Sequence, residues 1–365
     1  MDAPPPTGIA TALIVHQRKP LNAEPPLGRL GAGFLTAPDD FYIRTHGTIP
    51  GLDASAHRLR LTGKLAQPQE LTLQDLRTRF PRQTVTATLQ CAGNRRGELD
   101  HVRPVDGAKW RAGAIGTATW TGVSLAAVLR AAGCDADPSL HVAFEALDTI
   151  EQDGRSFAYG ASIPLAKAMA PEVMLALDMD GAPLRPEHGF PLRLVVPGQI
   201  GARSVKWIGT IRVQDTPSDN HYQQQEYRLL PADMGKDNLD PAAGIMLHEL
   251  PVNAAICAPE DGATLPAGTV SLRGYALSGG RSIERVEVSA DHGGSWVRAT
   301  LESQPGDPWA WTLWQARLDL PAGRHTLAVR AWDAAGQTQP ERLESVWNWK
   351  GYLNTAWHRV VIHCR

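Results

Sequence analysis

The residues most able to do chemistry begin with one cysteine that lies close to two arginines. The stretch TATLQCAGNRRGELD (86–100) opens as an apolar, β-branched run, which is typical of a buried strand. The run ends at Cys91, and Arg95 and Arg96 follow within five residues. Fixed positive charge favours the thiolate form of a nearby cysteine, and a thiolate either attacks carbon or binds a soft metal. Packing in the core is the third interpretation, because free cysteines are commonly buried.

Three further segments, at 41–50, 156–165 and 178–209, place cationic or aromatic side chains beside glycine-containing backbone. Their candidate residues are Arg44, His46, Tyr159, His188, Arg193, Ser204, Val205 and Lys206. Cations and free backbone amides suit an anionic cofactor that carries a phosphate. No GxGxxG or P-loop pattern is present, which argues against the usual nucleotides. Taken singly, each residue also has an ordinary structural explanation, such as a surface ion pair or a core aromatic.

Composition limits the classes of protein that this chain can represent. It has 365 residues, a formal net charge of −2 and 43% hydrophobic residues, which predicts a globular protein of two or three domains. No basic block indicates nucleic-acid binding, and no apolar run is long enough to span a membrane. The four cysteines lie far apart in sequence, which favours a reducing compartment and argues against a structural zinc site. We see no secretory signal, and we expect a cytoplasmic protein, or a periplasmic one if a signal has been removed.

The elements that must position these residues change in kind along the chain. Up to about residue 215, strand-like runs such as 192–198 alternate with helix-like stretches such as 124–133, a mixed α/β pattern. Residues 215–250 are polar and rich in Pro and Gly, and we interpret them as a long surface connection. Short alternating runs with regular turns then predict an antiparallel β-sandwich. We therefore expect domains at 1–245 and 246–365.

Eight of the eleven tryptophans fall in this last third of the chain. They indicate either a well-filled sandwich core or a subunit interface, where aromatic residues are enriched.

Together these segments resemble the sulfite oxidase family of molybdenum enzymes. The motifs that carry the resemblance are FYIRTHG, TLQCAGNRR, GAIGTATW, YGASIPL, HGFPLRLVVPG and GARSVKW, and they occur in the order of the family. The later segments VSADHGGSW, WAWTLW and LNTAWHRV resemble the family's immunoglobulin-like dimerisation domain. The resemblance covers nearly the whole chain from about residue 14. It implies an α+β molybdopterin domain, a β-sandwich and a homodimer.

The resemblance also implies roles for individual residues. Cys91 matches the cysteine that coordinates molybdenum beside the dithiolene of a molybdopterin. The positions that match cofactor contacts are Tyr42, Ile43, Arg44, Thr45, His46, Asp148, His188, Arg193, Ser204, Val205 and Lys206. The positions that match the substrate pocket are Arg44, Arg96, Trp110, Tyr159 and Lys350. Sulfite is a small oxyanion, so guanidinium groups should attract and orient it while oxygen transfer yields sulfate. Tyr159 would help to manage the proton.

Two positions depart from the family pattern. Lys350 stands where sulfite oxidases usually carry a third pocket arginine, so the charge is kept but the bidentate fork is lost. Asp106 stands where some relatives carry a lysine, and an acid there would weaken the positive field unless it faces away.

Several functions related to sulfite oxidation remain open from the sequence. Relatives of the same fold reduce nitrate or sulfoxides, and a non-catalytic interaction protein or a cysteine hydrolase are more distant alternatives. The chain shows no CxxCH, cytochrome b5-like or iron–sulfur pattern, so we expect no haem. Electrons would then pass to oxygen, as in the haem-free plant type that VHQRKPLNAEPP resembles, or to a separate cytochrome.

Overall fold

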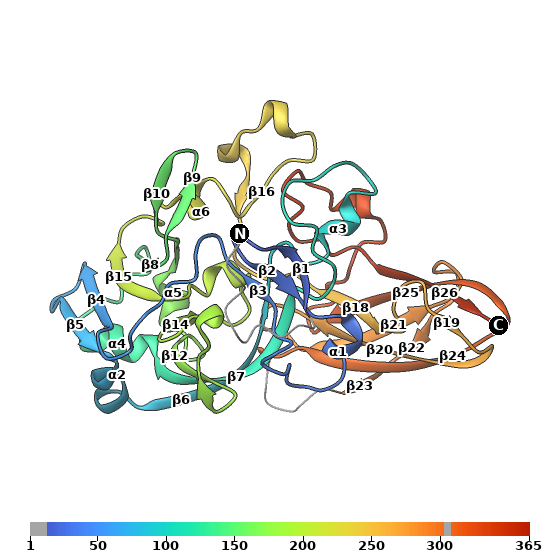
Figure 1. Cartoon of the computed structure of the whole chain (residues 1–365), viewed down its shortest axis with the longest axis horizontal. Helices are drawn as coiled ribbons and strands as arrows, with labels where there is room; N and C mark the ends of the chain where they lie inside the picture. The colour runs from blue at the N-terminus through green and yellow to red at the C-terminus, as the bar shows by residue number, and fades with distance from the viewer. Residues whose placement is uncertain (1–12, 303–307) are drawn as a thin grey trace, which may run out of the picture.

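A computed structural model describes residues 13–302 and 308–365, which form a mixed α/β unit followed by an all-β unit (Figure 1). The first unit takes up one side of the molecule in blue, green and yellow, and the second extends from it in orange and red. This arrangement confirms the predicted fold class. No helix among the described residues is long and apolar enough to cross a membrane.

Two sheets give the first unit its framework. The first contains, in spatial order, β11 (Gly160–Pro164), β8 (His141–Ala146), β15 (Ile208–Gln214), β4 (Arg58–Gly63) and β5 (Gln69–Thr72). The second contains β13 (Ala182–Pro183), β12 (Met174–Met179), β7 (Ile115–Ser124) and β6 (Arg82–Gln90), and β14 (Arg193–Val195) pairs with β12. Only β15 and β4 pair in parallel among these strands. Three short helices pack on them: α2 (Leu73–Arg79), α4 (Leu125–Ala131) and α5 (Leu165–Ala168).

Local sequence accounts for several of these elements. The buried, β-branched run before Cys91 forms the end of β6, as predicted. The helix expected at 124–133 is α4, which begins after Ser124 because its hydroxyl caps the amide of Ala127. The strand expected at 192–198 is shorter than predicted, because the chain turns at Gly198 with φ of +80°.

A third, small sheet carries the first predicted arginine. It contains β1 (Ile14–Gln17), β2 (Asn22–Glu24) and β3 (Ile43–Arg44), in that order. Asn22 pairs in register with Arg44 across β2 and β3, and the Asn22 side chain accepts from the Arg44 guanidinium at 3.1 Å. The sheet therefore fixes the position of Arg44.

The segment 215–250 is only partly the surface connection that its composition predicts. Helix α6 (His221–Gln224) buries Tyr222 and Gln223, and Tyr227 is only 3% exposed. The exposed part is the hairpin of β16 (Arg228–Leu229) and β17 (Ile245–Met246), which projects from the molecule in yellow (Figure 1). The prediction was wrong for residues 222–230 because aromatic rings packing over long range outweigh a polar local composition.

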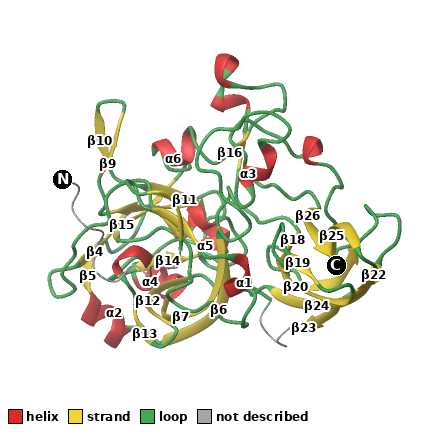
Figure 2. Ribbon diagram, turned by 45° about the vertical axis from the view of Figure 1, so that its right-hand side comes forward, coloured by secondary structure: helices red, strands yellow, loops and turns green. Residues whose placement is uncertain are grey.

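The all-β unit is a sandwich of two sheets (Figure 2). One sheet contains β18 (Asn253–Ala258), β20 (Gly268–Leu277), β24 (Thr312–Leu320) and β23 (Thr300–Glu302). The other contains β19 (Thr264–Leu265), β26 (His358–Cys364), β25 (Gly323–Asp333), β21 (Ile283–Ser289) and β22 (Val297–Arg298). Between β25 and β26 the chain leaves the sandwich and returns to the first unit, where Trp347 packs with Leu99 and Val105.

The tryptophans of this part of the chain lie in three environments, of which the sandwich core was predicted; the subunit interface stays a prediction. Trp314 fills the sandwich core. Trp311 lies between the two units, where its backbone amide donates to the Thr88 hydroxyl at 2.7 Å. Trp296 and Trp332 lie half-buried on the outer face of the sandwich, where Arg330 stacks on both rings. Contact between the two units therefore explains part of the tryptophan content.

Candidate active site

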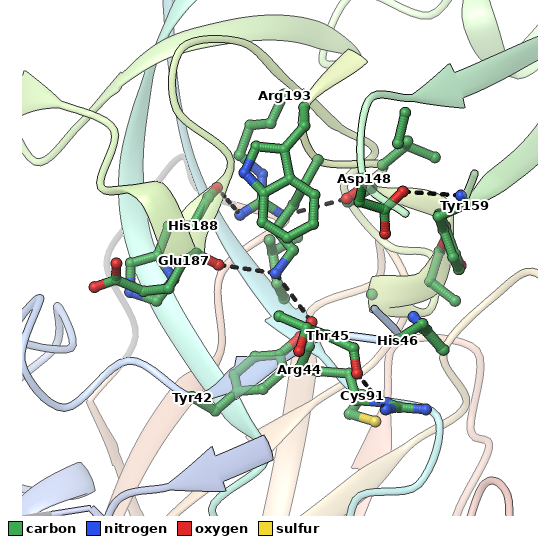
Figure 3. A pocket seen from close by; sticks show the side chains of 18 of the residues that line it. Tyr42, Arg44, Thr45, His46, Cys91, Asp148, Tyr159, Glu187, His188 and Arg193 are labelled. Atoms are coloured by element: carbon green, nitrogen blue, oxygen red, sulfur yellow. Dashed lines mark hydrogen bonds between the residues drawn. The ribbon is translucent and has the colours of Figure 1, made fainter. Parts of the chain in front are cut away.

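Twelve of the predicted site residues line one cavity between the two sheets of the first unit and the small sheet (Figure 3). The cavity and its opening hold about 660 Å³ of space free of protein atoms, part of it open to solvent. The predicted residues that line it are Tyr42, Arg44, Thr45, His46, Cys91, Asp148, Tyr159, His188, Arg193, Ser204, Val205 and Lys206. Figure 3 places Cys91 and Arg44 close together at one end, with Arg193 at the other.

Cys91 owes its position to the end of β6. Its backbone amide donates to the Ala114 carbonyl at 2.9 Å, which continues the pairing of β6 with β7 by one residue. The chain then turns away, and the Gly93 amide points back at the Cys91 sulfur at 3.4 Å. Arg95 completes the turn in the left-handed conformation, with φ of 65°. The thiol is 5% exposed and faces the cavity.

Cationic side chains line the cavity from the Arg44 backbone to its far end, where Arg193 lies. Lys206 Nζ donates to the carbonyls of Arg44 and Glu187, at 3.0 and 2.8 Å. Arg193 donates to the carbonyls of His188 and Ser204, at 2.8 and 3.3 Å. Carbonyl partners hold both cations in place without neutralising them, so their charge stays available to a ligand.

The electrostatics of this end favour an anionic ligand. Burial, with the neighbouring Arg193, holds the pKa of Lys206 well below its ordinary value. Burial lowers the pKa of Arg193 to about 10, and burial together with Lys206 lowers that of His188 well below its usual range. A negative group bound among them would reverse these shifts, because it stabilises the charged forms.

Arg44, at the end of β3, and His46, two residues beyond it, line the same cavity. Arg44 Nη1 is held by the Asn22 side chain and by the Thr45 carbonyl, at 3.1 and 2.7 Å. Burial, with Arg44 and Lys206 nearby, holds the pKa of His46 well below its usual range. The imidazole is therefore neutral, and its Nε2 lies 2.8 Å from the Tyr227 hydroxyl.

Tyr159 and Asp148 form one side wall of the cavity. The Asp148 carboxylate accepts from the Tyr159 amide at 2.9 Å, and the Tyr159 hydroxyl donates to the Ala202 carbonyl at 2.8 Å. Burial raises the pKa of Asp148 and raises that of Tyr159 well above its usual range. The hydroxyl of Tyr159 thus donates its hydrogen bond to a backbone carbonyl and not into the cavity.

Four predicted residues do not line the cavity: Ile43, Arg96, Trp110 and Lys350. Trp110 is fully buried, with no partner for its Nε1 among the described residues. Arg96 begins α3 (Arg96–Leu99), stacks its guanidinium 5.1 Å from the Tyr352 ring centre, and leaves its buried Nε unpaired within the described chain. Lys350 pairs with two carboxylates.

Tyr227 lines the cavity but was missed by sequence reasoning. Burial raises its pKa to about 12, and the charges that influence it include Arg44, Cys91 and Arg96. Its hydroxyl therefore lies among the groups at the cysteine end, where Tyr159 was expected to act. The pair Glu226–Tyr227 falls in the segment interpreted as a surface connection, so the only local signal was an acid and an aromatic in a polar stretch.

The chemistry of these donors fits a molybdopterin. Among residues 13–302 and 308–365 no cluster of three His, Cys, Asp or Glu side chains is built to hold a metal ion. A metal at Cys91 would therefore bring its other ligands with it, as a dithiolene does. The cations at the opposite end suit the phosphate of the same cofactor.

Comparison with known proteins defines the class. Residues 46–222 match the oxidoreductase molybdopterin binding domain, and residues 245–365 match the Mo-co oxidoreductase dimerisation domain. The chain therefore carries a molybdopterin-binding oxidoreductase domain followed by a dimerisation domain.

Individual relatives narrow this class to a family. Human mitochondrial sulfite oxidase is 44% identical over 364 residues, covering 96% of this chain and 66% of its own length. Sulfite oxidase of Arabidopsis thaliana is 42% identical over 371 residues, covering 96% and 94%. The crystal structure of the sulfane dehydrogenase SoxCD from Paracoccus pantotrophus aligns with a TM-score of 0.81 at 26% identity, covering 99% of this chain and 93% of that one. The chain belongs to the sulfite oxidase family. It spans just under two thirds of the length of the human relative.

Proposed function

We propose that this protein oxidises sulfite to sulfate at a molybdenum centre ligated by Cys91. The observation that carries the proposal is the cavity itself, which joins a buried thiol and Arg44 at one end to Arg193 at the other, with the Lys206 ammonium in contact with the Arg44 carbonyl. When bound, the molybdenum cofactor supplies oxygen-atom transfer and takes up two electrons. The names of the human and Arabidopsis relatives support sulfite as the substrate.

Arg44 attracts and orients the sulfite dianion. Its guanidinium is half-buried, lines the cavity with Cys91 and is held by Asn22, so a cationic donor is fixed at the reacting end of the cavity. A preorganised cation in a buried site stabilises developing negative charge more than a solvated one does.

Tyr227 and His46 handle the protons that the reaction releases. Conversion of sulfite and water to sulfate yields two electrons and two protons, and the protons need an acceptor near Cys91. The neutral His46 ring lies 2.8 Å from the Tyr227 hydroxyl, so it can accept a hydrogen bond from that hydroxyl and orient it toward the reacting end of the cavity. We assign to Tyr227 the proton-managing role first expected of Tyr159, whose hydroxyl donates to Ala202.

The proposal extends to partners and setting. The match to a dimerisation domain supports a homodimer through the sandwich. Electrons pass to oxygen or to a separate cytochrome, with no haem in this chain. The four free cysteines fit a reducing compartment, so we propose a cytoplasmic location, which subcellular fractionation can test.

A sulfite-dependent assay on protein of known molybdenum content tests the function, run with ferricyanide and with oxygen alone. Turnover that scales with molybdenum is the expected result, and matching peroxide release under oxygen would identify an oxidase. Molybdenum-replete protein that does not oxidise sulfite would contradict the proposal. In the same assay, Tyr227→Phe should lower kcat more than Tyr159→Phe does.

A further inference from the structure

Lys350, Asp106 and Glu226 form a closed ion-pair cluster beside the cavity, here called the Lys350 cluster. Lys350 Nζ lies 3.1 Å from Asp106 Oδ2 and 2.7 Å from Glu226 Oε1. The two departures from the family pattern, Lys350 and Asp106, are thus each other's partners, although 244 positions separate them in the chain.

The two carboxylates of this cluster neutralise the positive charge of Lys350. Its side chain is 12% exposed, and the two carboxylates together carry one more unit of charge than the ammonium. Burial acts to lower the pKa of Lys350, but Glu226 and Asp106 outweigh it and raise the pKa above its usual value. The two carboxylates thus stabilise the ammonium form, which has no excess positive charge to offer a second anion.

A chain of contacts leads from the Lys350 cluster to the cavity. The Tyr352 hydroxyl donates to Glu226 Oε2 at 2.9 Å. One side of the Tyr352 ring stacks on Tyr227, with ring centres 5.3 Å apart, and the Arg96 guanidinium lies 5.1 Å from the Tyr352 ring centre. Tyr352 therefore links Glu226 to a cavity-lining tyrosine and to a buried arginine.

The backbone reinforces the same link. Asp106 N donates to the Trp349 carbonyl at 2.8 Å, which joins the loop of Asp106 to the segment of Lys350. The neighbouring glycines Gly107 and Gly351 approach the Arg96 side chain so closely that a Cβ on either would lie 2.7 or 2.5 Å from it. The cluster therefore holds together two segments that enclose Arg96.

We propose that Lys350 is a positioning residue in this protein and not an anion ligand: it neutralises Asp106 and Glu226 and so holds Tyr352 against Tyr227 and Arg96. The inference rests on the proposed function, since the reaction positioned is sulfite oxidation. It predicts that Tyr352 keeps its position only while the side chain at position 350 pairs with the two carboxylates. Either lysine or arginine can supply the charge for this pairing.

The test compares Lys350→Met, Lys350→Arg and the double variant K350M/E226Q in the molybdenum-loaded protein. Sulfite kinetics report kcat and KM, and calorimetric titration with inorganic sulfate reports anion binding whether or not sulfite is turned over. Lys64→Met is the matched control, because Lys64 forms a single, exposed ion pair with Asp215 away from the cavity. Absence of sulfite turnover in the wild type would contradict the proposed function. The Kd for sulfate, measured by calorimetry, would then still show whether Lys350 binds the anion.

A positioning role gives a particular pattern of effects. Lys350→Met should lower kcat about tenfold, because two carboxylates lose their partner, while the Kd for sulfate changes less than about threefold. K350M/E226Q should recover much of kcat, since the more buried of the two stranded carboxylates is gone and an amide oxygen still accepts from Tyr352. Lys350→Arg should stay within about threefold of the wild type, as should Lys64→Met.

An anion-ligand role gives the opposite pattern and would overturn the proposal. Lys350→Met would then weaken sulfate binding by about tenfold or more with little change in kcat, because a charge-assisted hydrogen bond to the ligand is lost. E226Q would bring no recovery, and Lys350→Arg would bind sulfate more tightly than the wild type through its bidentate fork. Should Lys350→Met fail to fold, the Lys350→Arg result still decides.

Discussion

Replacing Gly107 by alanine should displace the Arg96 side chain and lower sulfite turnover by more than the accompanying loss of stability explains. Gly107 has φ of +88°, and a Cβ there would lie 2.7 Å from Arg96 Nη1. Gly181 is the matched control, because its φ is +78° and nothing lies within 4 Å of the added Cβ. Both variants place alanine in the left-handed region, but only one of them disturbs an arginine.

The size of each effect follows from this geometry. Alanine in the left-handed region costs about 1–2 kcal/mol, so both variants should lose about that much free energy of unfolding. In Gly107→Ala the end of a flexible side chain must also move, from 2.7 Å to at least 3.4 Å, which is a shift of about 0.7 Å. Misplacing a group that acts on the substrate by 1 Å can cost about 100-fold, so if Arg96 belongs to the substrate pocket, as the family resemblance implies, kcat/KM for sulfite should fall by about 10- to 100-fold.

Urea denaturation and steady-state sulfite kinetics on the two variants provide the measurement. We expect similar losses of stability in both variants and a large loss of activity in Gly107→Ala alone. If kcat/KM of the two variants agreed within twofold, the position of the Arg96 guanidinium would not matter to the reaction, and the assignment of Arg96 to the substrate pocket would be wrong.

Three further predictions concern the metal ligand, the cofactor phosphate and pH. Cys91→Ser should abolish sulfite turnover while the melting temperature stays within a few degrees, because the thiol faces a cavity; a wild-type rate would refute the central assignment. Arg193→Met should lower the molybdenum retained per chain after gel filtration, and Arg185→Met, which removes a surface ion pair, should not. Burial lowers the pKa of His358 to about 4 in the folded protein, against 6.5 for an ordinary histidine. The unfolded chain therefore binds more protons between these values, so stability is complete above pH 6.5 and falls by on the order of 3 kcal/mol as the pH approaches 4. His358→Gln should flatten that part of the urea-stability profile.

Residues within a continuous motif could be placed from the sequence. Val85 to Leu89 read as a buried strand, and Cys91 does follow the end of β6. Arg44 and His46 line one cavity, as their two-residue spacing predicts, although β3 ends at Arg44 and His46 lies just beyond it. These predictions succeeded because strand periodicity and the residues at a strand's end are properties of the local chain.

Residues outside such motifs were misjudged. Tyr227 lies in a polar stretch that predicts a surface loop, yet it is 3% exposed and faces the cavity. Its burial depends on rings from distant segments, among them Tyr352 and His46. No local pattern records that packing, because the stabilising contacts form only when the chain is folded.

The sequence alone therefore determined the family, the two-unit architecture and the group of side chains around Cys91, since these depend on motifs and periodicity. Tertiary structure alone decided what Lys350 and Asp106 do. From the sequence, Lys350 was a weaker substitute for a pocket arginine and Asp106 a possible disturbance of the positive field. In the folded protein they neutralise each other, with Glu226 as the third member. The physical reason is that the effect of a charge depends on what lies within a few ångströms of it, and here that neighbour comes from more than two hundred residues away in the chain.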